Sequence, residues 1–239
     1  MLKFGVIVFP GSNCDHDCYS LVKHVLGHEC EFIWHEDKDL SGFDCVILPG
    51  GFSYGDYLRT GSIASLSLIM KAVQEFAENG GPVIGICNGF QVLLESGLLP
   101  GSLIKNSSLK FVCKWTYVRV ENTDTPFTKY LNIGDVLKIP VAHGEGNYFC
   151  SKEDLKNLEE GAEIVFRYCD ENGEITPRSN PNGSVGNIAG ICNKRGNILG
   201  MMPHPERCSE ELLGGINGVL IFESLINHLT SPANIAKNG

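Results

Sequence analysis

Several features that would place this chain in another class of protein are missing from its sequence. No apolar run approaches the roughly 20 residues of a membrane-spanning helix, so we expect no membrane segment and no membrane partner. Positive charge is scarce: 19 Lys and Arg face 28 Asp and Glu, a net charge of −9. This balance argues against nucleic acid as a partner. No linker, repeat or low-complexity segment interrupts the chain, so we expect one domain over residues 1–239.

We also expect neither a secretory leader nor a disulfide framework. The apolar stretch near the N-terminus, Phe4–Phe9, is too short for a leader, and no small-residue cleavage site follows it. The ten cysteines are scattered without paired spacing, which favours reduced thiols. We therefore expect a cytoplasmic protein.

The first half of the chain alternates strand and helix patterns. Strands are expected over four apolar runs: Phe4–Phe9, Cys30–Trp34, Asp44–Leu48 and Pro82–Ile86. Helices are expected from a cap at Asn13 or Asp15 to Leu26, over Ser62–Glu78, and just after Cys87. This order predicts a parallel sheet with helices on both faces, and loops at the carboxyl ends of its strands that carry the site.

The second half looks antiparallel. Its expected strands are Phe111–Val120, Asp135–Val141, Ile164–Cys169, Asn187–Cys192 and Ile198–Met202. Asn180–Gly183 is a turn signal of hairpin type, and a last helix is expected over Gly215–His228. The predicted fold class is therefore α/β: a single domain with a central, mostly parallel sheet flanked by helices, and an added antiparallel region in the C-terminal half.

Cys87 lies where a buried strand meets a helix, with Gly85 before it and Gly89 after it. A side chain on such a sharp turn stands clear of the backbone, as the serine of a nucleophile elbow does. The dipole of the following helix favours the thiolate, which is the nucleophilic form of cysteine. The alternative is a small buried apolar residue, as most free cysteines are.

His204 and Glu206 flank a proline in an extended stretch, so their side chains project to the same side. A carboxylate there would orient the imidazole, which could then deprotonate a thiol. Cys87, His204 and Glu206 are thus a candidate triad. The alternative is a rigid turn with a solvated carboxylate.

Attack on a carbonyl carbon also requires donors for the oxyanion. The amide of Asn88 is one candidate, and Gly50 and Gly51, at the end of a neighbouring strand, can present a second. Gln91 lies on the first turn of the elbow helix, where its amide could reach a substrate. Cys14, Cys18, His24 and His28 do not form a firm zinc signature, so no metal site is expected.

Three motifs resemble those of class I, triad-type glutamine amidotransferases: Leu48–Gly51, Gly85–Gln91 and His204–Glu206. Four further stretches resemble the glutaminase subunits of phosphoribosylformylglycinamidine synthases, in their small, separate form: Gly11–Asp15, Gly50–Arg59, Pro140–Gly146 and Asn187–Ile191. The resemblance covers nearly the whole chain.

The resemblance implies that Cys87 attacks the side-chain amide of glutamine, while Gly51 and Asn88 hold the oxyanion. The ammonia then passes to a large synthetase subunit, which works with a small accessory subunit in purine biosynthesis. The sequence has no P-loop motif, so ATP and Mg are expected in the synthetase and no cofactor in this chain. The candidate substrate contacts are Gly50, Gln91, Phe52, Arg59 and Glu145; Arg59 and Glu145 could instead dock the synthetase.

Two alternatives remain open at this stage. A cysteine hydrolase or peptidase of related fold would share the elbow, but it would not explain His204–Glu206 together with Gly50, Gly51 and Gln91. A catalytically inactive regulatory subunit is the second, although all three triad residues are present.

Overall fold

The computed structural model describes residues 1–232 and 234, which form a single α/β domain around one large sheet. In these residues the sheet has nine strands in the order β2-β1-β3-β4-β11-β10-β9-β6-β7. A second, two-stranded sheet pairs β5 with β8. The last part of the predicted domain, residues 233 and 235–239, lies outside the described residues.

The strands are β1 (Lys3–Val8), β2 (Glu29–Trp34), β3 (Cys45–Leu48), β4 (Val83–Ile86), β5 (Ser102–Ile104), β6 (Val112–Val120), β7 (Val136–His143), β8 (Asn147–Phe149), β9 (Ile164–Cys169), β10 (Ile188–Cys192) and β11 (Ile198–Met201). The α-helices are α1 (Asp15–Ser20), α2 (Ile69–Glu78), α3 (Asn88–Glu95), α4 (Lys152–Glu160) and α5 (Val219–Leu229).

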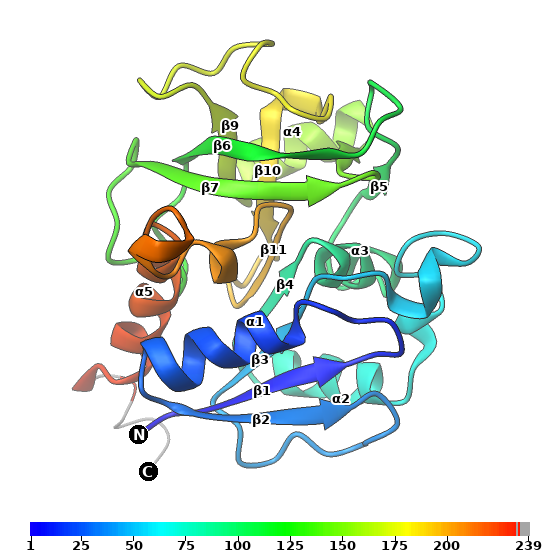
Figure 1. The fold of residues 1–239 in the computed structure, drawn as a ribbon, viewed down its shortest axis with the longest axis vertical. Helices are drawn as coiled ribbons and strands as arrows, with labels where there is room; N and C mark the ends of the chain where they lie inside the picture. The colour runs from blue at the N-terminus through cyan, green and yellow to red at the C-terminus, as the bar shows by residue number, and fades with distance from the viewer. Residues whose placement is uncertain (233, 235–239) are drawn as a thin grey trace.

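The sheet changes from parallel to antiparallel pairing along its width. Strands β2, β1, β3, β4 and β11 pair in parallel, and the pairs from β11 through β10, β9 and β6 to β7 are antiparallel. In Figure 1, β1 and β2 lie at the bottom and β6 and β7 at the top, with β4 and β11 between them. The fold class expected from the sequence is confirmed. One strand differs: β11, expected in the antiparallel region, pairs in parallel with β4 and antiparallel with β10.

Parallel register brings three segments to one edge of the sheet. Gly85 of β4 is level with Leu48 of β3, and Ile86 is level with Met201 of β11. All residues of β3, β4 and β11 are buried, as strands covered on both faces should be. The residues that follow these three strands therefore emerge side by side.

Three local expectations were wrong. The helix expected over Ser62–Glu78 begins at Ile69, because Ser67 is extended (ψ 149°) after a short 3-10 turn. Leu66, whose spacing from Ile69 and Val73 predicts a place on the buried face of such a helix, is 84% exposed. The last helix begins at Val219, not Gly215.

The hairpin-type signal at Asn180–Gly183 does not join two strands directly. It lies within the long connection between β9 and β10, residues 170–187. The Asn182 side chain is fully buried and donates from Nδ2 to the carbonyl of Gly146 at 2.7 Å. The turn thus anchors another loop, and the real hairpin is the turn between β10 and β11.

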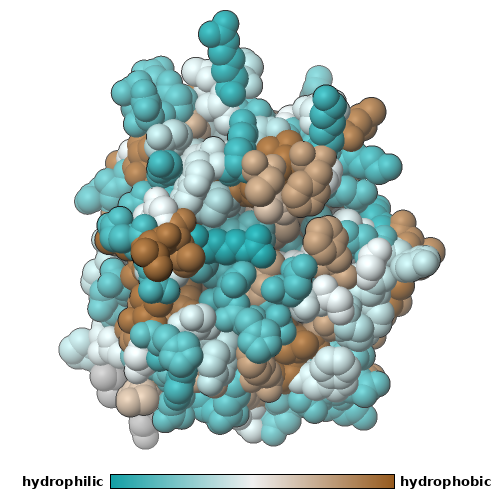
Figure 2. All heavy atoms as spheres, in the orientation of Figure 1, coloured by the Kyte–Doolittle hydropathy of each residue, from teal (hydrophilic) through white to brown (hydrophobic). Residues whose placement is uncertain are grey.

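The surface is mostly hydrophilic, with separate hydrophobic patches (Figure 2). Exposed apolar side chains occur in the segment after Gly55, including Tyr57 and Leu58, and again at Leu212 and Ile216. In the part of the chain that the structure describes, no helix combines the length and the apolar character needed to span a bilayer.

Candidate active site

Cys87 sits between β4 and α3 with a strained backbone (φ 50°, ψ −103°). Such a conformation costs on the order of 1–3 kcal/mol and persists only where its surroundings enforce it. Its N–H donates to the carbonyl of Met201 on β11 at 2.8 Å. Its thiol donates to the carbonyl of Ala142 on β7 at 3.7 Å. The predicted elbow is therefore present.

Gly89 explains how the elbow helix packs so closely against β3. A Cβ at this position would lie 2.0 Å from the carbonyl oxygen of Leu48. No side chain fits there, so glycine lets the first turn of α3 rest on the backbone of the neighbouring strand.

His204 and Glu206 follow β11, the strand beside β4. Nδ1 of His204 lies 2.6 Å from Oε1 of Glu206, and both side chains are buried. The other ring nitrogen, Nε2, is buried without a hydrogen-bond partner among the described residues. Burial lowers the pKa of His204, but Glu206, followed by the thiols of Cys87 and Cys14, raises it well above its ordinary value. The ring is thus poised to hold a proton beside the Cys87 sulfur.

Cys14 is a second thiol beside His204. Its sulfur accepts from Nη2 of Arg207 at 2.9 Å, while Nε of Arg207 donates to Asp17 at 3.0 Å. Burial is the main cause that raises the pKa of Cys14, so this thiol stays protonated at neutral pH. Both thiols precede a helix, but Cys87 is the one on the strained strand-to-helix turn that is typical of a nucleophile elbow.

One cluster in the described residues has the donor types of a metal site. The ligand atoms of Cys14, His204 and Glu206 all lie within 4.8 Å of one another. The Arg207 guanidinium against the Cys14 sulfur, however, places a positive charge beside this cluster. A cation there would meet electrostatic repulsion, so the expectation of no metal stays a prediction.

Gly50, Gly51 and Asn88 lie on either side of the elbow. A Cβ on Gly50 would lie 2.8 Å from Cε1 of His204, so this glycine leaves room for the imidazole. Gly51 (φ +137°) forms a bridge with Ser12. Asn88 begins α3, and the first N–H groups of a helix have no intrahelical acceptor. The N–H of Asn88 therefore has no acceptor within its helix, and the assignment of Gly51 and Asn88 as oxyanion donors stays a prediction.

A cavity of about 450 Å³ opens onto Cys87 and His204. Of the other predicted residues, Gly51, Phe52, Gln91 and Glu145 line it. Gln91 donates from Nε2 to the carbonyl of Glu145 at 2.7 Å, and its Oε1 accepts from Asn88 at 2.9 Å. The predicted nucleophile, the predicted base and three of the five predicted substrate contacts thus line one cavity, and Gly50 and Arg59 do not.

Arg59 does not reach this cavity. Its guanidinium donates to Oε2 of Glu95 at 2.6 Å, and the side chain is 56% exposed. The carboxylate at the end of α3 attracts it away from the pocket, so a direct contact between Arg59 and glutamine has no support in this arrangement.

Sequence reasoning missed several residues of the cavity wall. Asp56, Thr60, His143 and Arg207 line it and were given no individual role. Nδ1 of His143 lies 3.1 Å from Oδ1 of Asn106. Burial, and then His204, lower the pKa of His143 to about 4, so this ring is neutral. The only sequence signal for two of them was their place in the stretches that carry the family resemblance: Asp56 follows Gly51, and His143 precedes Glu145.

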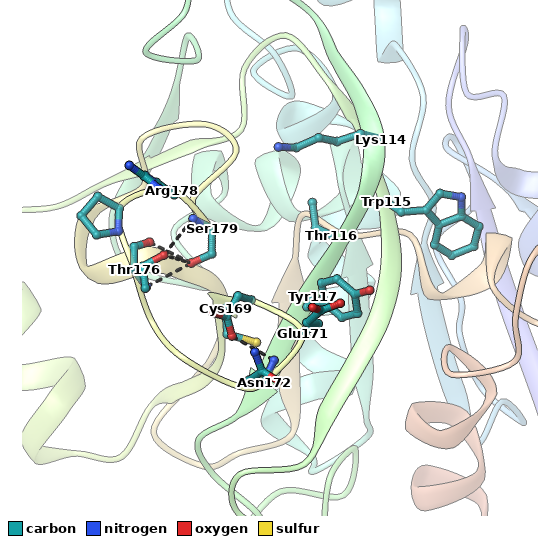
Figure 3. A pocket seen from close by; sticks show the side chains of 12 residues that line it. Lys114, Trp115, Thr116, Tyr117, Cys169, Glu171, Asn172, Thr176, Arg178 and Ser179 are labelled. Atoms are coloured by element: carbon teal, nitrogen blue, oxygen red, sulfur yellow. Dashed lines mark hydrogen bonds between the residues drawn. The ribbon is translucent and has the colours of Figure 1, made fainter.

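A larger hollow, about 810 Å³, lies between β6 and the loop after β9 (Figure 3). Lys114 and Tyr117 line one side, and Thr176 and Ser179 line the other. It contains none of the predicted site residues. Burial raises the pKa of its one thiol, Cys169, to about 11. At neutral pH that thiol is protonated, so the smaller cavity is the candidate active site.

Comparison with known proteins identifies the family of the chain. The model of the CobB/CobQ-like glutamine amidotransferase domain matches residues 2–215. The chain belongs to this family. It is 58% identical to "Phosphoribosylformylglycinamidine synthase subunit PurQ" of Moorella thermoacetica, over 95% of this chain and 96% of the relative. The PurQ subunit of Aquifex aeolicus is 54% identical over 95% of this chain and 100% of the relative.

Solved structures are similar to this chain as well. A chain from the structure of PurLQS from Thermotoga maritima is 44% identical, with a TM-score of 0.85, and 96% of this chain and 99% of that chain are covered. A glutamine amidotransferase, also from Thermotoga maritima, is 16% identical with a TM-score of 0.62, over 96% of this chain and 99% of that chain. This second likeness is one of fold.

Proposed function

We propose that this amidotransferase is the glutaminase subunit of a phosphoribosylformylglycinamidine synthase. It hydrolyses the side-chain amide of glutamine through a cysteine thioester and supplies ammonia for purine biosynthesis. One observation carries the proposal: Cys87 and the Glu206-bound imidazole of His204 emerge from adjacent parallel strands into one cavity. The names of its relatives support the particular reaction.

The first half of the reaction forms the thioester. The Cys87 thiolate attacks the amide carbon of glutamine, and the carbonyl oxygen becomes an oxyanion. The backbone N–H groups of Gly51 and Asn88 donate to that oxygen. The His204 imidazolium, held by Glu206, gives its proton to the departing nitrogen, and ammonia leaves as the C–N bond breaks.

The second half releases glutamate. His204, now neutral, takes a proton from water, and the resulting hydroxide attacks the thioester carbon. The carbon–sulfur bond breaks, which regenerates the Cys87 thiolate beside the His204 imidazolium. Glu206 keeps Nδ1 protonated throughout, so Nε2 is always the nitrogen that exchanges protons with the substrate.

Substrate contacts follow from the lining of the cavity. Gly50 leaves space beside the imidazole, and Gln91, Phe52 and Glu145 contact the glutamine. Arg59 is paired with Glu95 outside the cavity, and we assign it to docking of the synthetase instead of to glutamine.

The partners follow from the chemistry. Ammonia needs an activated acceptor, and the large synthetase subunit supplies it with ATP and Mg, assisted by a small accessory subunit. The chain has no P-loop motif of its own. We place the enzyme in the cytoplasm, where its thiols stay reduced, and extend the domain to residue 239.

The test is reconstitution with the synthetase and accessory subunits. Cys87→Ser should abolish glutamine-dependent product formation and leave activity with added ammonia within about twofold. A glutamine-analogue diazoketone should label Cys87 in the parent enzyme. Cys113→Ser is the matched control, because that thiol is exposed and outside the cavity. Loss of both activities in Cys87→Ser, or labelling at another cysteine, would contradict the proposal.

A further inference from the structure

We propose that Asp56 and Glu145 together bind the α-ammonium group of glutamine and so select a free amino acid as the nitrogen donor. This inference rests on the proposed glutaminase function and adds a subsite to it. The two carboxylates come from segments far apart in the sequence, yet both line the cavity that contains Cys87.

Glu145 is linked to the nucleophile Cys87 through a single residue, Gln91. Gln91 donates from its backbone N–H to the carbonyl of Cys87 at 3.1 Å and from Nε2 to the carbonyl of Glu145 at 2.7 Å. Oε2 of Glu145 accepts from the hydroxyl of Thr60 at 3.1 Å. The carboxylate is therefore held at a set position beside the place where the reacting amide must lie.

Asp56 is held in a strained segment. Its own φ is +57°, and its neighbours Tyr54 and Leu58 also have positive φ. The N–H of Tyr54 donates to Pro10 at 2.6 Å, and its hydroxyl lies 3.0 Å from Nδ1 of His35. Non-glycine residues in this region mark backbone that the surroundings enforce, often around a ligand.

Asp56 also lacks a partner for part of its carboxylate. Oδ1 is buried and has no hydrogen-bond partner among the described residues. Burial, and then Glu145, raise the pKa of Asp56 to about 6. Two carboxylates that face one cavity repel each other, and a bound ammonium would relieve that repulsion and donate to the orphaned oxygen.

The other charged groups leave this end of the cavity to a cation. Two cationic side chains line the cavity: Arg207 is engaged by Asp17 and Cys14, and the imidazolium of His204 is paired with Glu206. His143 is neutral because burial lowers its pKa to about 4. The second sign that this cavity takes a ligand is Nε2 of His204, which is unpartnered among the described residues in a side chain that is only 2% exposed.

The arrangement predicts how glutamine binding depends on pH. The titratable groups around the pair are Cys14, Cys87, His143, His204 and Arg207 in the cavity wall, and Arg59, which acts on Glu145 from outside. As pH falls through about 6, Asp56 gains a proton and the subsite loses one charge. The KM for glutamine should therefore rise below about pH 6, while ammonia-dependent activity does not follow the same curve.

The test compares Asp56→Asn and Glu145→Gln in the reconstituted enzyme with L-glutamine as substrate and glutaramate, which lacks the amine, as competing ligand. Asparagine tolerates positive φ, so Asp56→Asn removes the charge and keeps the backbone. Each variant should raise the KM for glutamine about 10–100-fold and change kcat and the glutaramate inhibition constant less than about threefold. Asp56→Asn should also flatten the rise in KM below pH 6.

The control is Asp124→Asn, an exposed carboxylate outside this cavity, which should change nothing. An unchanged KM for glutamine in both variants would overturn the inference. So would equal weakening of glutamine and glutaramate, which would mean a structural role. A parent enzyme that does not use glutamine at all would instead defeat the proposed function.

Discussion

Nδ1 of His204 and Oε1 of Glu206 are 2.6 Å apart, and neither side chain is more than 2% exposed. An ionic hydrogen bond buried this deeply fixes both the tautomer and the plane of the imidazole. The chemistry at Cys87 therefore depends on a carboxylate that does not itself line the cavity.

Glu206→Gln tests that dependence. The amide keeps the shape of the side chain but removes its charge and offers an N–H, which favours the wrong tautomer of His204. We expect glutamine-dependent kcat to fall by about 10³-fold or more, with a smaller change in KM. Steady-state kinetics with glutamine and with ammonia measures this. Glu211→Gln, an exposed carboxylate nearby, is the control. A loss confined to KM would contradict the orienting role.

The same pair should shape the pH dependence of stability. The pKa of His204 is raised in the folded state, so protonation of this ring stabilises the fold. This stabilisation is fully present below the unfolded pKa of about 6.5, and it is lost as pH rises through the raised pKa. At pH 6, Glu206→Gln should lower the free energy of unfolding by about 3 kcal/mol, because it leaves the buried imidazole without its carboxylate. This cost should shrink at alkaline pH, as measured by urea unfolding. A cost that grows with pH would refute the argument.

Gly89→Ala tests the close contact between α3 and β3. The added methyl group would lie 2.0 Å from the Leu48 carbonyl oxygen, so the helix must move. We expect a loss of about 3 kcal/mol in the free energy of unfolding and a large loss of glutamine-dependent activity. Gly134→Ala is the comparison: its added methyl group meets no atom within 4 Å, although the backbone there has a positive φ (+89°). It should cost only about 1 kcal/mol. Equal costs for the two variants would mean that the contact is unimportant.

Arg59→Ala tests where that guanidinium acts. Since Glu95 holds it outside the cavity, the KM for glutamine should stay within about twofold of the parent value. An exposed ion pair contributes little, so the free energy of unfolding should change by less than about 1 kcal/mol. The KM for glutamine is measured by steady-state kinetics at a saturating concentration of the synthetase. A tenfold rise in the KM for glutamine would mean that Arg59 does contact the substrate.

The parts of the site that depend on strand order could be predicted from the sequence. Apolar runs ending at Leu48 and Ile86 were enough to place Gly51 and Cys87 along one edge, because parallel strands end at the same side. His204 was assigned by its chemistry alone, since the strand before it was expected to be antiparallel and in fact pairs in parallel with β4. Asp56 could not be assigned in this way. Its position depends on successive positive φ angles, which only tertiary contacts such as that between Tyr54 and His35 impose.

The break at Ser67 was also beyond reach, because the periodicity of Ile63, Leu66, Ile69 and Val73 fits an uninterrupted helix. The structure turns Leu66 outward, and a pattern of apolar spacing does not distinguish a buried leucine from one left at the surface.

The order of strands in the sheet determines whether the active site would survive a break in the chain. The nucleophile follows β4 and the base follows β11, so the whole antiparallel region is a long excursion between two strands that end up adjacent. Backbone pairing across β4 and β11, and not chain continuity, holds the two groups in register. A single cleavage at the exposed turn beginning at Glu171 should therefore leave two fragments that remain associated, with sulfur and imidazole still facing each other.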